Sequence, residues 1–183
     1  MIGRSRTGDD MTFLRMAGLA AVCASMLAAP AGADDDWVTT TSADGVFHFA
    51  SPLQPNSQTS RGDDGGVGFS QTVYTVVTDS LVIMTDEAIY DPGPHFVDPK
   101  LVLTGFLQGL KAELISSEDQ PFTRGPGDVL PGLIAAARTD ALTCHLRVVA
   151  DGLKVFVMSA CGRAGHDATA DIDRAIASFA ITK

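Results

Sequence analysis

Two cysteines and two histidines near the C-terminal end have the types and spacing that suggest chemistry. Cys144 and Cys161 enclose a short segment, His145 follows the first cysteine, and His166 lies shortly after the second. Cysteine and histidine together can bind a transition metal, whereas two cysteines alone can form a redox-active pair or a structural disulfide. The sequence therefore raises three interpretations of this region.

The residues between the cysteines predict a β-hairpin. Apolar and polar side chains alternate before and after Asp151-Gly152, as in two half-buried strands joined by a tight turn. With Asp151-Gly152 as the turn, Cys144 faces Ser159, and the cysteines are diagonal neighbours about 7–8 Å apart, too far for an unstrained disulfide. With Gly152-Leu153 as the turn, Cys144 lies directly opposite Cys161. A disulfide therefore selects the second register.

The metal and redox interpretations fit this pattern less well. Neighbouring residues of a strand point to opposite faces, so Cys144 and His145 do not readily bind one metal. Closed zinc sites also show C-x₂₋₄-C or H-x₃₋₅-H spacing, and neither occurs here. A redox-active pair stays open as an alternative, but two cysteines in an exported protein usually form a structural bond.

Residues 1–33 have the organisation of a secretory signal peptide. A basic start precedes the apolar run MAGLAAVCASMLAA, and the small residues Ala31-Gly32-Ala33 precede DDDW. We expect cleavage after Ala33 and a mature single domain of residues 34–183 in the periplasm or outside the cell. A buried N-terminal helix is the alternative. The apolar run is shorter than the about 20 residues that span a bilayer, so we expect no stable membrane anchor.

The charge of the mature domain argues against nucleic-acid partners. The whole chain has a formal net charge of −9, and residues 1–33 hold three of its 13 basic and two of its 22 acidic residues, which leaves −10 for the rest. Such a surface repels phosphate backbones. We therefore expect no nucleic-acid partner.

The remaining segments predict strands and two helices. Strands are predicted at Trp37–Ser42 and Val46–Phe49, in a hairpin of Gly66–Thr78 and Leu81–Glu87, and less clearly at residues 115–124 and 131–139. Residues 51–66 are rich in glycine, proline and polar residues and predict a mobile loop. These elements predict an α+β domain with an antiparallel sheet of about six to eight strands and two main helices packed on it.

The two helices have clear start signals and apolar faces. Asp98 can cap the first helix and Pro99 suits its first turn. Its predicted apolar stripe consists of Leu103, Phe106, Leu107, Leu110 and Leu114. The second helix begins near Asp167 or Thr169, and its predicted buried face consists of Ile172, Ala175, Ile176 and Phe179.

The loop YDPGPHFVD, which precedes the first helix, carries the histidine best placed for function. His95 lies in it, and Asp86, Glu87 and Asp91 are nearby in sequence. Loops carry functional residues more often than strands do, and a histidine with carboxylates can bind a metal or exchange protons. His95 and Asp91 are therefore the candidate loop site, although a plain loop histidine explains the same residues.

Motifs of common enzymes do not occur in the sequence. It has no G-x-S-x-G nucleophile elbow, no glycine-rich phosphate loop ending in Lys-Ser/Thr, and no H-E-x-x-H. The acidic clusters Asp34–Asp36 and Asp63-Asp64 do not follow the D-x-[DN]-x-[DN]-G spacing of a calcium loop. We therefore expect no cofactor and no enzymatic activity.

Several of these features, in this order, resemble a known family. Phe47 and Pro52 (FHFASP) follow an N-terminal strand; a hairpin, the long helix, the turn Gly125–Gly127, two further strands and a helix ending Ser178-Phe179 come next. The mature chain resembles the PsbP/Mog-type α/β/α sandwich proteins, which include the extrinsic PsbP subunit of photosystem II, a Ran-binding nuclear-transport factor and many exported bacterial proteins. The cysteine pair is not a general feature of that family, and the aromatic residue that often follows the early proline is missing here.

The resemblance implies a non-enzymatic module that binds or stabilises a partner, although a fold alone does not fix function. We expect an exported, non-catalytic accessory protein of the cell envelope with a protein partner. One alternative is a small-ligand or lipid carrier, which needs an apolar cavity between the sheet and the helices. The other is a metal-dependent hydrolase that uses the His95 loop.

Overall fold

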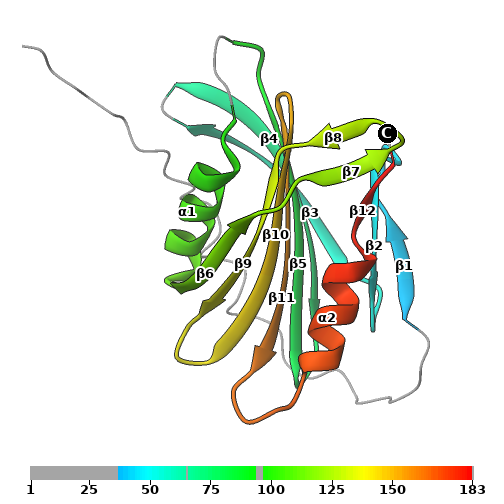
Figure 1. Ribbon diagram of the computed structural model, residues 1–183, viewed down its shortest axis with the longest axis vertical. Helices are drawn as coiled ribbons and strands as arrows, with labels where there is room; N and C mark the ends of the chain where they lie inside the picture. The colour runs from blue at the N-terminus through cyan, green and yellow to red at the C-terminus, as the bar shows by residue number, and fades with distance from the viewer. Residues whose placement is uncertain (1–36, 65, 94–96, 183) are drawn as a thin grey trace, which may run out of the picture.

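The computed structural model describes residues 37–64, 66–93 and 97–182, and Figure 1 shows their arrangement. The predicted signal peptide and its cleavage position after Ala33 lie outside the described residues. The elements in chain order are β1 (Val38–Thr41), β2 (Phe47–Ser51), β3 (Asn56–Asp64), β4 (Val67–Val77), β5 (Leu81–Tyr90), α1 (Pro99–Leu110), β6 (Glu113–Asp119), β7 (Phe122–Gly125), β8 (Asp128–Leu130), β9 (Gly132–Arg138), β10 (Leu142–Asp151), β11 (Lys154–Arg163), α2 (Thr169–Ser178) and β12 (Ala180–Ile181).

A seven-stranded antiparallel sheet forms the centre of the domain, in the order β3-β4-β5-β11-β10-β9-β6. β11 is one of its inner strands, and every residue from Val155 to Gly162 is buried. A strand that is covered on both faces needs apolar or small side chains at successive positions, and the sequence VFVMSACG supplies them.

Each face of the central sheet is covered by one helix (Figure 1). α1 packs on the face that includes Leu146 and Val148. α2 packs on the opposite face, which includes Val149 and Phe156, together with a small sheet of order β1-β2-β12. The predicted α+β sandwich with two main helices is therefore confirmed, and the seven strands of the central sheet fall within the expected range.

Aromatic rings fill the core between the central sheet and the small sheet. The Phe47 ring of β2 lies 5.6 Å from Tyr74, 5.7 Å from Phe156 and 5.9 Å from Phe179, measured between ring centroids. These partners come from β4, β11 and the end of α2. Phe47, which is completely buried, therefore joins three parts of the fold.

α1 begins and ends at residues with clear capping geometry. The Asp98 carboxylate accepts a hydrogen bond from the Lys100 N–H at 2.9 Å, and Lys111 ends the helix in the left-handed conformation with φ 54°. The predicted apolar stripe is wrong at Leu114, which lies in β6 and is 44% exposed. Its spacing from Leu110 suits a helix, but the turn at Lys111 redirects the chain before Leu114 is reached.

α2 matches the second predicted helix. Ile172 and Ala175 are buried against the sheet, and Phe179 is buried just beyond the helix. The Ser178 hydroxyl accepts a hydrogen bond from the Ala50 N–H at 2.8 Å, which fixes the end of α2 to β2. β12 then pairs with β2 and completes the small sheet.

Residues 51–66 were predicted as a loop, and this prediction is wrong because they contain the edge strand β3. β3 pairs with β4 along its whole length, from Asn56 opposite Thr75 onward. Most of its described side chains are exposed, so polar residues occupy both faces and no apolar alternation marks the strand. At Gly62 a Cβ would collide with the Phe69 ring of β4, so the ring lies directly over the glycine.

The two weaker strand candidates, residues 115–124 and 131–139, contain strands with different boundaries. The first covers most of β6 and part of β7, and the second corresponds to β9. β7 and β8 pair with each other as a separate ribbon. Arg124 of this ribbon forms an ion pair with Asp128 within the ribbon at 2.6 Å, and its ion pair with Asp151 at 2.5 Å holds the ribbon on the tip of the β10–β11 hairpin.

Candidate functional site

The cysteine hairpin has the register that places Cys144 opposite Cys161. Asp151 pairs with Lys154, so Gly152-Leu153 is the turn, and the glycine has φ 62°. A disulfide joins the two cysteines, whose Cα atoms are 4.0 Å apart. Counted from the Asp151–Lys154 pair, the cysteines fall on a non-hydrogen-bonded pair, where facing side chains are closest. The sequence prediction of this register is confirmed.

The disulfide belongs to the core beneath α1. Cys144 is 1% exposed and Cys161 is 3% exposed, so a thiol in solution reaches neither sulfur unless the hairpin opens. His145 lies on the opposite face, where its Nδ1 is 3.4 Å from Asp173 Oδ1 of α2, and His166 is exposed in the turn after β11. The two histidines therefore do not join the two cysteines in one site. The disulfide is buried in the core, as is typical of a structural bond.

The carboxylates of the candidate loop site are dispersed. Asp86 and Glu87 are successive residues of β5 and point to opposite faces of the sheet. Asp91 lies just beyond the end of β5, with its Oδ1 3.5 Å from the guanidinium of Arg61. His95 lies outside the described residues. In the described part of the chain, no three His, Cys, Asp or Glu side chains are grouped so that they could hold a metal ion.

Asp86 is the most deeply buried ionisable side chain of the described residues, at 2% exposure. It lies on the α1 face of β5, between Met84 and Ala88 along the strand. Its Oδ2 accepts a hydrogen bond from Gln71 Nε2 of β4 at 2.5 Å, and no described residue donates to its buried Oδ1. Burial raises the pKa of Asp86 to about 7; the Gln71 hydrogen bond lowers this pKa and the charge of Glu87 raises it.

An aspartic acid with a pKa near 7 could exchange a proton at neutral pH. A substrate cannot reach Asp86, however, because the side chain is enclosed by the sheet and the residues packed on it. We therefore interpret Asp86 as a buried structural group whose ionisation is linked to the stability of the fold.

Glu87 occupies a second buried position on the other face of β5, at 7% exposure. Burial raises its pKa, and the neighbouring Asp44 carboxylate raises it further, while the Lys154 ammonium lowers it. Lys154 Nζ also lies 3.6 Å from Asp44 Oδ2, and the Ser42 hydroxyl donates to Asp44 at 2.8 Å. This polar group links the β1–β2 turn to the central sheet.

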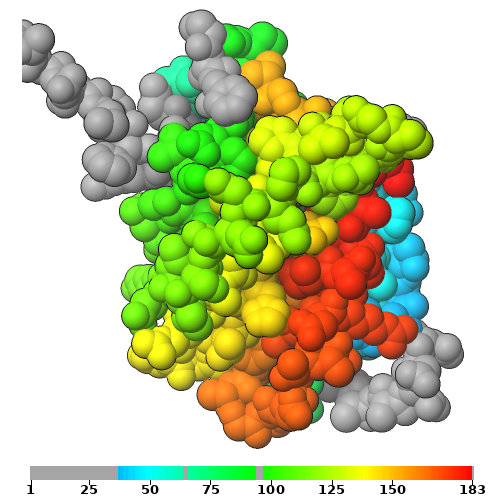
Figure 2. Space-filling model, in the orientation of Figure 1, coloured from blue at the N-terminus to red at the C-terminus, as the bar shows by residue number. Residues whose placement is uncertain are grey.

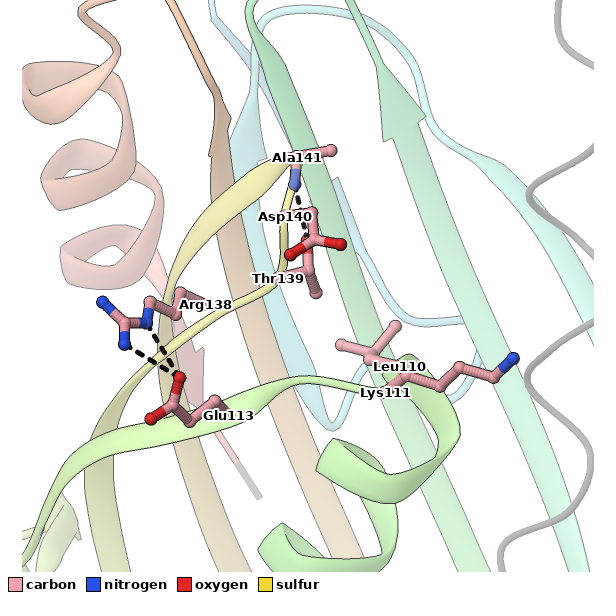
Figure 3. Close-up of a pocket in the computed structure, with 7 residues that line it drawn as sticks. All are labelled: Leu110, Lys111, Glu113, Arg138, Thr139, Asp140 and Ala141. Atoms are coloured by element: carbon pink, nitrogen blue, oxygen red, sulfur yellow. Dashed lines mark hydrogen bonds and ion pairs between the residues drawn. The ribbon is translucent and has the colours of Figure 1, made fainter.

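A surface hollow of about 460 Å³ lies at the C-terminal end of α1 (Figure 3). It is lined by Leu110, Lys111, Glu113, Arg138, Thr139, Asp140 and Ala141. Two guanidinium nitrogens of Arg138 lie 3.0 and 2.9 Å from Glu113 Oε2, and the Lys111 side chain points away from this pair. The four charged side chains have formal charges that cancel, so the hollow selects neither anions nor cations. Its residues come from separate segments and carry no sequence motif.

Comparisons with known proteins support the fold and assign no site. No family model and no curated protein matches this chain. The structure is similar to the solution structure of cyanobacterial PsbP (CyanoP) from Synechocystis sp. PCC 6803, with a TM-score of 0.50 and 13% sequence identity over 85% of this chain and 98% of that chain. This likeness shows that the fold is PsbP-like, as the sequence resemblance implied. Among the described helices, none is long and apolar enough to cross a membrane.

Proposed function

We propose that this chain is a PsbP-like protein exported to the cell envelope, where it acts as a non-catalytic accessory protein that binds a protein partner. The observation that carries the proposal is a PsbP-like sandwich joined internally by a buried disulfide. Disulfides persist in oxidising compartments outside the cytoplasm. The signal-peptide pattern of residues 1–33 supports the same location.

The positions of the chemically capable residues also favour a binding role. The cysteines are joined within the core, and Asp86 and Glu87 are buried on opposite faces, so these carboxylates do not form one metal or acid–base site. A lipid carrier would need an apolar cavity between sheet and helices. The described hollow lies instead at the surface, with charged residues in its lining. The outer surface is therefore the part of the described domain best suited to a function.

The test is to isolate the protein from the envelope fraction of its native cells after chemical cross-linking. We expect the mature chain to begin at Asp34, to contain no free thiol, and to be cross-linked to one envelope protein at a reproducible ratio. Recovery of the chain from the cytoplasm with residues 1–33 attached would contradict export. Recovery of no protein above the background of an unrelated exported control would contradict the binding role.

A further inference from the structure

β6 is an open edge of the central sheet. Among the described strands it pairs with β9 alone, on one side, and all seven of its residues are exposed. The unpaired side of an edge strand presents backbone N–H and C=O groups that can pair with another chain. A β-bulge between Leu114 and Ser116 leaves Ile115 without a partner in β9, so the regular part of the edge is Ser116–Asp119.

Exposed apolar side chains lie at the start of β6 and in the first turn of α1, next to the end of β6. Leu114 is 44% exposed and Ile115 is 54% exposed on β6, and Leu101 is 51% exposed on α1. Lys100 Nζ donates to Asp119 Oδ2 at 2.9 Å, so the first turn of α1 lies next to the end of β6. Figure 2 shows β6, in light green, on the face turned toward the viewer beside α1. We call β6 with the adjoining exposed side of α1 the α1–β6 surface.

The other edge of the central sheet, β3, is polar and exposes no large apolar side chain. β3 reads NSQTSRGDD and contributes no large apolar side chain to the surface. Polar edge strands of this kind discourage pairing with other chains. The two edges therefore differ, and only β6 combines unpaired backbone groups with exposed apolar side chains.

The charges of β6 indicate what kind of strand it accepts. Its three charged residues are all acidic: Glu113 is paired with Arg138, Asp119 is paired with Lys100, and Glu118 forms no ion pair with a described residue. A second copy would bring the same charges together, because full antiparallel overlap of two β6 strands sets Glu113 opposite Asp119 at both ends. Facing like charges are destabilising, whereas a facing lysine or arginine is favourable.

We propose that the α1–β6 surface binds an extended segment of a partner protein, which adds beside β6 as a further strand. The segment carries apolar side chains that cover Ile115 and Leu114, and at least one lysine or arginine that pairs with Glu118. This inference rests on the proposed function, because it states where and how the protein partner is bound. β-Strand addition obtains affinity from backbone hydrogen bonds and specificity from the alternating side chains.

The experiment places the photo-cross-linking residue p-benzoylphenylalanine at position 117 of β6 in the full chain, expressed in the native cell envelope. Ser57 of β3, which is also exposed, is the matched control position. We expect an adduct from position 117 and none from position 57. Mass spectrometry of the adduct should identify one partner segment that contains a lysine or arginine.

Substitutions then test the two chemical parts of the surface. Ile115→Lys should lower the yield of the adduct about tenfold or more, because it removes an apolar contact, while Val129→Lys, at an equally exposed apolar residue, should leave it unchanged. Glu118→Lys should lower the yield of the adduct by a factor of about two to five or more. Asp79→Lys, in the exposed β4–β5 turn, should leave the yield unchanged.

The outcomes separate this inference from the proposed function. Suppose that the unaltered chain is cross-linked chemically to an envelope protein, but position 117 gives no adduct or both Lys variants retain the adduct. The α1–β6 surface is then not the binding surface, and the proposed accessory role is unaffected. An adduct to a second copy of this chain, to lipid, or to a segment without basic residues also overturns the inference. If chemical cross-linking of the unaltered chain yields no envelope protein above background, the inference and the proposed function are both contradicted.

Discussion

The ionisation of Asp86 should make the stability of this protein depend strongly on pH. In the unfolded chain the pKa of an aspartic acid is close to its ordinary value of 3.8, whereas burial raises the pKa of Asp86 to about 7 in the fold. The folded state therefore binds the proton more tightly. The stability that this group contributes is complete below about pH 4 and is lost as the pH rises toward 7.

The size of the effect follows from the two pKa values. A difference of about three pH units, at 1.36 kcal/mol each, corresponds to about 4 kcal/mol of unfolding free energy in all, of which about 3 kcal/mol is lost between pH 4 and pH 7. Between pH 5 and pH 8 the loss from this one group is about 3 kcal/mol. Asp86→Asn should remove the dependence, because an asparagine stays neutral and can still bond to Gln71.

The assay is urea unfolding followed by circular dichroism at several pH values between 5 and 8, on the natural chain and on Asp86→Asn. We expect the difference in unfolding free energy between the two proteins to change steadily with pH in favour of the variant. Groups that do not interact with Asp86 titrate equally in both proteins and cancel in this difference. Asp79→Asn, at an exposed turn residue, is the control and should follow the natural chain. If the Asp86→Asn curve runs parallel to that of the natural chain across the whole range, the reasoning is refuted.

Three further predictions concern the disulfide, the start of α1 and the aromatic core. Replacing Cys144 and Cys161 by serine should lower the unfolding free energy by about 3 kcal/mol, because the bond closes a chain segment with a separation of 17; urea titration that shows no difference between the oxidised protein and this variant would contradict a stabilising bond. Asp98→Ala should cost about 1 kcal/mol in the same titration, while Asp98→Asn, which keeps an accepting oxygen, should cost much less. Phe47→Ala should cost about 3–5 kcal/mol and alter the fluorescence of the single tryptophan, Trp37, which belongs to the same core; a loss below about 1 kcal/mol would mean that the aromatic core repacks.

The accuracy of the sequence predictions depended on how strongly the local chain determines each element. The β10–β11 register could be predicted because Gly152 limited the turn to two positions and the cysteine pair selected one of them. The end of α1 could not, because the apolar spacing continues to Leu114 although Lys111 has already left the helical conformation. A single left-handed residue is not visible in an apolar pattern.

Two other features depend on the whole fold and left little trace in the sequence. β3 is a strand because β4 lies beside it, and its own polar residues are typical of a loop. Asp86 was grouped with the loop site because it is close to His95 in sequence. The structure instead buries it, since both faces of β5 are covered in the middle of the sheet. Burial of this kind is set by distant segments, and no local pattern of residue types reports it.

The small sheet β1-β2-β12 joins residues from opposite ends of the described chain. The Thr182 N–H donates to the Val46 carbonyl at 2.7 Å across a separation of 136 residues. During synthesis, β2 therefore leaves the ribosome long before β12 exists, and Phe47 and Phe49 lack the part of their cover that α2 and β12 provide until those elements have been made. The small sheet is therefore completed only after β12, near the C-terminal end of the described chain, has been synthesised.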